Sequence, residues 1–174
     1  MDLSVLNDAA AAPGAEKEDS AFRQKLLHCC GSKKWTEEMA KKFPVRDFEQ
    51  LCQVADEADA SLTRQDWLEA FAAHPRVRYC ICIELDGIFD ECGMMMQATK
   101  NADEAVLDRL EELNDAYFKK FGYIYIVCAT GKSAPEMLRI LASRIDNNPE
   151  DELSVAAREQ SKITKIRLEK LLQE

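Results

Sequence analysis

Apolar residues recur at helical spacing through most of the chain. In 102–120, Val106, Leu110, Leu113 and Tyr117 fall on one face, while the acids of the first turns and the lysines of the last suit the helix dipole. This pattern predicts a long amphipathic helix. Similar spacing predicts further helices over 20–27, 32–43, 45–59, 63–74, 133–145 and 148–174.

Capping residues support several of these boundaries. Thr63 stands three residues before Asp66, and Ser133 stands three residues before Glu136, which is the spacing of a capping box. In the last helix Asn148 is in the cap position, and a proline follows it at the first helical position. The sequence therefore marks where these helices begin.

One stretch breaks the helical pattern. Residues 121–131, FGYIYIVCATG, are rich in β-forming residues, but no second strand is available to pair with them. We therefore predict an all-α fold, a single compact multi-helix domain over 20–174 with a short extended segment near 121–130. Residues 1–19 are predicted to form a short N-terminal segment and a flexible connection, because 8–19 are small, charged and interrupted by Pro-Gly.

Composition narrows the classes of partner. The chain has 174 residues, 47% of them hydrophobic, which is enough for a packed core. The net charge of −9 argues against nucleic acid or an anionic membrane as a general partner, although a local basic pocket could still bind a small anion. No signal peptide or membrane-spanning run is visible, so we expect neither, and seven irregularly spaced cysteines make a poor disulfide framework. We therefore expect a cytoplasmic protein.

Three features are candidates for chemistry, each with a plainer alternative. His74 stands at a helix end, where the exposed carbonyls stabilise a protonated imidazole, but residue type alone favours an ordinary helix-end histidine. Arg167 shares a helix face with apolar residues and needs an anion, an internal ion pair or a snorkelling geometry. The segment from Tyr125 to Ala129 offers backbone amides to a ligand or is simply buried. No ligand set for a metal is visible.

Two long blocks resemble a known family. LNDAYFKKFGYIYIVCATGKSAPEML and RIDNNPEDELSVAAREQSKITKIRLEKLL, together with CGSKKWTEEMAKKFP and AAHPRV, are similar to the 2-oxo-4-hydroxy-4-carboxy-5-ureidoimidazoline (OHCU) decarboxylases. The resemblance covers most of 20–78 and almost all of 102–172. It implies a cofactor-free, all-helical lyase that converts this ureidoimidazoline to (S)-allantoin in urate breakdown, acting as a homodimer.

The resemblance also assigns roles to particular residues. His74 matches the catalytic histidine, with Pro75 beside it in the substrate site, and Arg167 matches an arginine of the terminal helix that faces the site. The residues whose backbone contacts the substrate are matched by Tyr125, Ile126, Val127, Cys128 and Ala129.

The chain departs from the family between residues 78 and 101. Arg78 replaces a glycine, and the expected Glu-Gln pair is absent. Counting back from the 102–120 helix makes Gln97 the substrate-binding glutamine, puts Met96 in the glutamate position and leaves Glu91 as the nearest upstream acid. We expect this segment to be irregular and the activity to be weakened. The alternative is a catalytically impaired homologue that acts as a non-enzymatic binding module.

Overall fold

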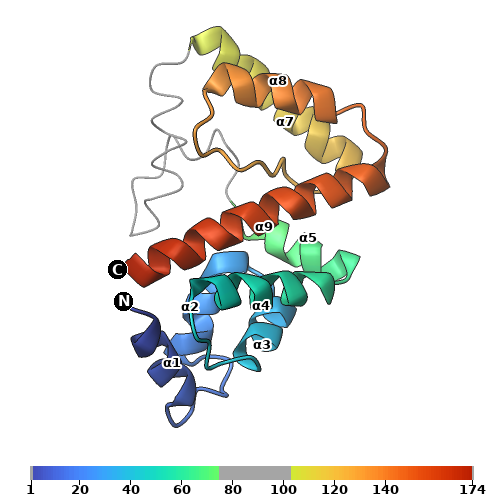
Figure 1. Cartoon of the computed structure of the whole chain (residues 1–174). Helices are drawn as coiled ribbons and strands as arrows, with labels where there is room; N and C mark the ends of the chain where they lie inside the picture. The colour runs from blue at the N-terminus through green and yellow to red at the C-terminus, as the bar shows by residue number, and fades with distance from the viewer. Residues whose placement is uncertain (1, 75–102, 174) are drawn as a thin grey trace. The chain divides into compact units, whose positions relative to one another are not determined.

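The computed structural model describes residues 2–74 and 103–173, and in these ranges it is all-α, as predicted (Figure 1). Its contacts divide the chain into two compact units, one of Met1–Ala70 with Ala157–Glu174 and one of Phe71–Ala156. The described helices are α1 (Leu3–Ala11), α2 (Ala21–Cys30), α3 (Lys33–Ala40), α4 (Phe48–Ala60), α5 (Arg64–Ala72), α7 (Glu104–Phe121), α8 (Ala134–Arg144) and α9 (Pro149–Gln173).

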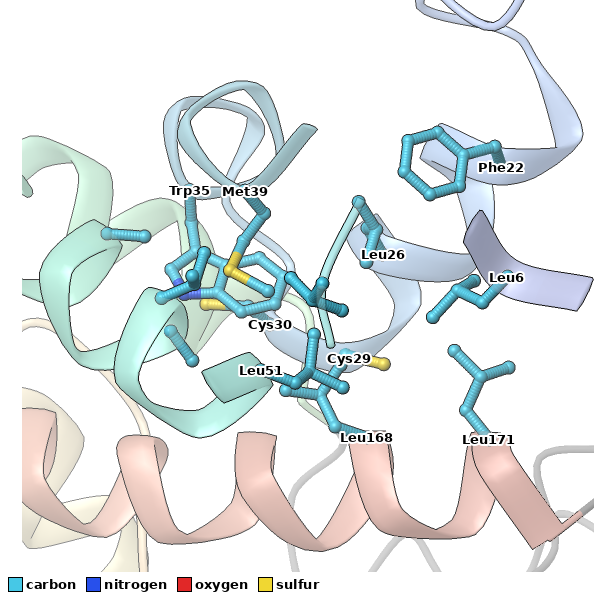
Figure 2. Close-up of a cluster of buried hydrophobic side chains, with 14 of the residues drawn as sticks. Leu6, Phe22, Leu26, Cys29, Cys30, Trp35, Met39, Leu51, Leu168 and Leu171 are labelled. Atoms are coloured by element: carbon cyan, nitrogen blue, oxygen red, sulfur yellow. The ribbon is translucent and has the colours of Figure 1, made fainter. Parts of the chain in front are cut away.

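The first unit is built around one cluster of apolar side chains (Figure 2). Trp35 and Met39 of α3 belong to it and are fully buried. Leu168 and Leu171 of α9 enter the same cluster from the far end of the chain. Burying large side chains of this kind stabilises a fold by about 1.5–3 kcal/mol each. Helices from both ends of the sequence therefore share one core.

Helix α1 differs from the prediction. Residues 8–11 were expected to be part of a flexible connection, but they continue a helix that Asp2 caps through the amides of Ser4 and Val5. Leu6 is fully buried in the core cluster. The expectation was wrong for these four residues because the alanines favour a helix and the buried leucine holds it. The boundary at residue 19 stays a prediction.

The predicted caps are present. Ser133 and Glu136 form the capping box of α8. The Thr63 side chain accepts the amide of Asp66, whose carboxylate in turn accepts the Thr63 amide. Asn148 accepts the amide of Asp151 at the start of α9. These bonds satisfy amides that have no partner inside their own helices.

The second unit contains α7, α8 and the irregular chain between them. The predicted stripe of α7 is buried at Leu110 and Tyr117 and half-buried at Val106 and Leu113. From Gly122 to Ser133 the chain is neither helix nor strand, which confirms that its β-rich composition does not produce a strand in the described part of the chain. Tyr123 packs its ring against those of Tyr117 and Phe71.

No helix within the two described ranges is long and apolar enough to cross a membrane.

Candidate functional site

His74 follows the end of α5. The helix ends at Ala72, and the amide of His74 donates to the carbonyl of Phe71 at 3.2 Å. Pro75 explains this ending, because a proline disfavours the helical conformation of the residue before it. His74 is half-buried and belongs to the second unit. The predicted histidine is thus at a helix end; Pro75 itself lies outside the described residues.

The segment 125–129 belongs to the same unit. Tyr125, Ile126, Val127 and Cys128 are buried, and Ala129 is half-buried. The ring centroids of Phe71 and Tyr123 lie 5.1 Å apart, so the last turn of α5 contacts the chain two residues before this segment. The structure therefore places His74 and the candidate substrate-binding backbone in one compact unit.

A buried polar network holds this segment in place. Nη1 of Arg144 donates to the carbonyl of Ile126 at 2.7 Å, and its guanidinium carbon lies 4.9 Å from the centre of the Tyr125 ring. The same guanidinium donates through Nε and Nη2 to Oε1 of Glu152 at 2.8 and 2.5 Å. Tyr117 donates to that oxygen as well, at 2.5 Å. One carboxylate therefore anchors α7, α8 and the irregular segment.

The network shifts the pKa values of Tyr117 and Arg144. Burial and the hydrogen bond to Glu152 raise the pKa of the Tyr117 hydroxyl far above its usual range. Burial alone would lower the pKa of Arg144, but the hydrogen bond to Glu152 outweighs it, so the pKa of the guanidinium is raised. The hydroxyl of Tyr117 therefore stays protonated and Arg144 stays charged at ordinary pH, so both remain hydrogen-bond donors that support the backbone.

Arg144 and Glu152 were not among the residues predicted from the sequence. An acid in the first turn of a helix and a base in the last turn are ordinary, since both suit the helix dipole. The available signal was that Glu152 and Arg144 both stand on inward faces of their helices, where a charge needs a partner. Lys132 was also missed; its Nζ donates to the carbonyl of Cys128 at 2.8 Å.

Arg167 is in the other unit. Its Nη1 donates to the carbonyls of His28 and Cys29 at the end of α2, both at 3.3 Å. These are the carbonyls that a helix leaves without an intrahelical partner, so the guanidinium stabilises the end of α2. This capping role is neither the ion pair nor the snorkelling geometry considered from the sequence, and a role of Arg167 in binding substrate stays a prediction. Gln97, with the whole anomalous segment 78–101, lies outside the described residues.

Over residues 2–74 and 103–173 there is no group of three or more His, Cys, Asp or Glu side chains arranged to hold a metal ion. The candidate groups for chemistry in these ranges are the imidazole of His74, the backbone amides of 125–129 and the guanidinium of Arg167.

The fold and these residues define a class of all-helical proteins in which a histidine at a helix end shares a compact unit with a buried irregular segment. A model of the OHCU decarboxylase family matches residues 15–169. The chain therefore belongs to the OHCU decarboxylase family.

Relatives and solved structures agree with this assignment. The chain is 37% identical over 145 residues to the uric acid degradation bifunctional protein TTL of Arabidopsis thaliana, covering 82% of this chain and 45% of that protein. It is 35% identical over 65 residues to the 2-oxo-4-hydroxy-4-carboxy-5-ureidoimidazoline decarboxylase of Amia calva, covering 37% of each. The chain thus spans less than half the length of these two curated relatives.

Two crystal structures resemble this structure. An OHCU decarboxylase solved in the presence of (S)-allantoin is 33% identical with a TM-score of 0.74, covering 86% of this chain and 98% of that one. An (S)-allantoin synthase has a TM-score of 0.68 at 21% identity, covering 97% of this chain and 53% of that one, which supports the fold alone.

Proposed function

We propose that this chain catalyses the cofactor-free decarboxylation of OHCU to (S)-allantoin, a step of urate breakdown. The observation that carries the proposal is the likeness to the OHCU decarboxylase solved in the presence of (S)-allantoin, which this chain matches over nearly all of that protein's length. The enzyme class is a carbon–carbon lyase, and we propose that it acts in the cytoplasm as a homodimer.

The first chemical step is loss of the carboxylate. The bond between the ring carbon and the carboxylate breaks, carbon dioxide leaves, and the bonding electrons delocalise into the adjacent imine and carbonyl. The negative charge then moves onto ring oxygen and nitrogen atoms. Backbone amides of the segment 125–129 and the guanidinium of Arg167 are the groups that we propose to stabilise it, because donors aimed at developing charge lower the barrier most.

The second step is protonation of the carbon. We propose that the imidazolium of His74 delivers this proton from one side of the ring and so sets the (S) configuration. The atoms balance, since the substrate anion and one proton give allantoin and carbon dioxide. His74 then regains its proton from solvent.

A weakened enzyme, or a homologue that has kept the scaffold as a binding module, is the competing proposal. It is favoured by the sequence of 78–101, which lacks the family's Glu-Gln pair. A missing orienting carboxylate would reduce the rate by loss of positioning rather than by loss of the proton donor.

One assay separates these proposals. Substrate generated freshly from urate is mixed with the purified chain, and the optical sign of the allantoin is followed by circular dichroism. An excess of the (S) product over the uncatalysed reaction supports the enzyme. Allantoin that forms at the uncatalysed rate and without optical activity contradicts it and leaves the binding module.

A further inference from the structure

Arg144 fixes the orientation of one peptide group in the segment 125–129. Its Nη1 donates to the carbonyl oxygen of Ile126, and that carbonyl shares a planar peptide with the amide of Val127. The peptide is trans, since the cis bond in the described chain is Phe43–Pro44. In a trans peptide the carbonyl and the amide point in opposite directions. The Val127 N–H therefore points away from the Arg144 guanidinium.

The orientation is held firmly because Arg144 itself cannot turn. Two of its nitrogens bond to Glu152, whose side chain is fully buried, and its guanidinium lies over the Tyr125 ring. Oε2 of Glu152 accepts from Asn147 at 2.9 Å, so the carboxylate is fixed at both oxygens. A guanidinium held by a two-pronged bond loses little further freedom when it binds a third acceptor.

The cationic donor also changes the strength of the amide. A carbonyl that accepts from a charged group is polarised, and the N–H of the same peptide becomes a better donor. The Val127 amide donates to no acceptor within the described residues, although the residue is buried. Arg144 thus prepares a strong, oriented donor on the segment that the family resemblance assigns to substrate binding.

We propose that Arg144, held by Glu152, is a positioning residue that aims the Val127 amide at the negative charge formed during decarboxylation. This inference rests on the proposed function. Lys132 acts on the Cys128 carbonyl and therefore on the Ala129 amide in the same way, from the turn that precedes α8.

The test replaces Arg144 and Glu152 together. The double variant Arg144→Met/Glu152→Met replaces a buried ion pair by apolar side chains of similar length, which avoids leaving one charge buried alone. We expect it to keep its helical circular dichroism and to lose kcat/KM by roughly 100-fold, with weaker binding of (S)-allantoin. A folded double variant within about threefold of the parent in kcat/KM overturns the proposal.

A matched control separates positioning from general packing. Tyr117→Phe removes one hydrogen bond to Glu152 but leaves the bond from Arg144 to Ile126 intact. We expect a lower melting temperature with kcat/KM close to the parent's. Should the double variant fail to fold, Arg144→Lys is judged by the same criterion, because the lysine ammonium lacks the planar fork that fixes the guanidinium between Glu152 and the Ile126 carbonyl.

An error in the proposed function can be distinguished from an error in the role of Arg144. If the parent itself forms no (S)-allantoin, the function is wrong, whatever Arg144 does. The positioning is then judged by the amide signal of Val127 in a nitrogen–proton NMR spectrum of the whole chain. A shift of that signal in the double variant but not in Tyr117→Phe supports the orienting role, and an unchanged signal overturns it.

Discussion

Ser161 of α9 donates its hydroxyl hydrogen to Oδ2 of Asp59 on α4, with 2.5 Å between the two oxygens. The other carboxylate oxygen, Oδ1, is buried and accepts no hydrogen bond from the described residues. Burial raises the pKa of Asp59 to about 6, while the bond from Ser161 opposes the rise and the nearby charge of Asp56 adds to it. At neutral pH the first unit therefore holds a buried and partly satisfied charge.

The raised pKa of Asp59 predicts that the free energy of unfolding depends on pH. A carboxyl whose pKa is higher in the folded chain than in the unfolded chain stabilises the fold while it is protonated. That contribution is complete below about pH 4 and is lost as the pH rises through about 6. Asp59→Asn should therefore raise the free energy of unfolding at pH 8 by about 2 kcal/mol and flatten the profile between pH 4 and 7.

Urea unfolding at several pH values measures this effect. Glu57→Gln is the control, because it removes an exposed carboxylate of α4 that pairs with Lys42 at 3.0 Å. The control should change stability by less than about 1 kcal/mol at any pH. A pH profile of Asp59→Asn that runs parallel to the parent's would show that this carboxyl does not titrate as argued.

His74→Asn should abolish the stereospecific formation of allantoin in a folded protein. A proton-transfer group contributes roughly 10²–10⁴ in rate, so the optical excess should disappear within the assay. His28→Asn is the control, since it replaces the other histidine, which is exposed on α2. Equal turnover by both variants would remove His74 from the mechanism.

Arg167→Lys separates the two roles of this side chain. The lysine keeps a positive charge beside the end of α2, so the loss of stability should stay near about 1 kcal/mol. If the planar guanidinium also binds substrate, KM should rise by about tenfold or more. Lys162→Gln, which removes an exposed cation from the same helix, should change neither quantity. A KM equal to the parent's would leave Arg167 with its capping role only.

Exhaustive treatment with EDTA should leave the activity intact, because the proposed chemistry uses only side chains and backbone amides. Initial rates before and after dialysis measure this. Activity that disappears and returns with zinc or another divalent ion would reveal a metal site elsewhere in the chain.

Met96→Glu should raise kcat/KM if the sequence alignment of 78–101 is right. The glutamate would supply the orienting carboxylate that the family places before its glutamine, here Gln97. The comparison is with the parent and with Glu91→Gln in parallel assays. A slower Met96→Glu together with an inactive Glu91→Gln would place the role at residue 91.

Local sequence signals were sufficient for most of the fold. Caps such as Ser133 with Glu136 act over three residues, so pattern alone reveals them. The β-rich composition of 121–131 was correctly set aside, because a strand needs a partner and the sequence offers none. Helix α1 was underestimated, since the burial of Leu6 depends on side chains far along the chain, including Leu171.

The candidate site was only partly predictable, for the same reason. His74 could be placed at a helix end because Pro75 follows it. The support of the segment 125–129 could not be found, because Arg144 reaches the Ile126 carbonyl across 18 residues and Glu152 reaches Tyr117 across 35. Pairings at such separations are decided by packing. Periodicity carries no information about them.

The core of the first unit has a consequence for folding during synthesis on the ribosome. Leu168 and Leu171 enter the same cluster as Leu6 and Leu26, although between 142 and 165 residues separate them in the order of synthesis. A nascent chain that ends at Ala70 has helices but lacks the side chains that close their core. The first unit made on the ribosome is therefore the last to be completed, and truncated chains should be targets for chaperones and proteases.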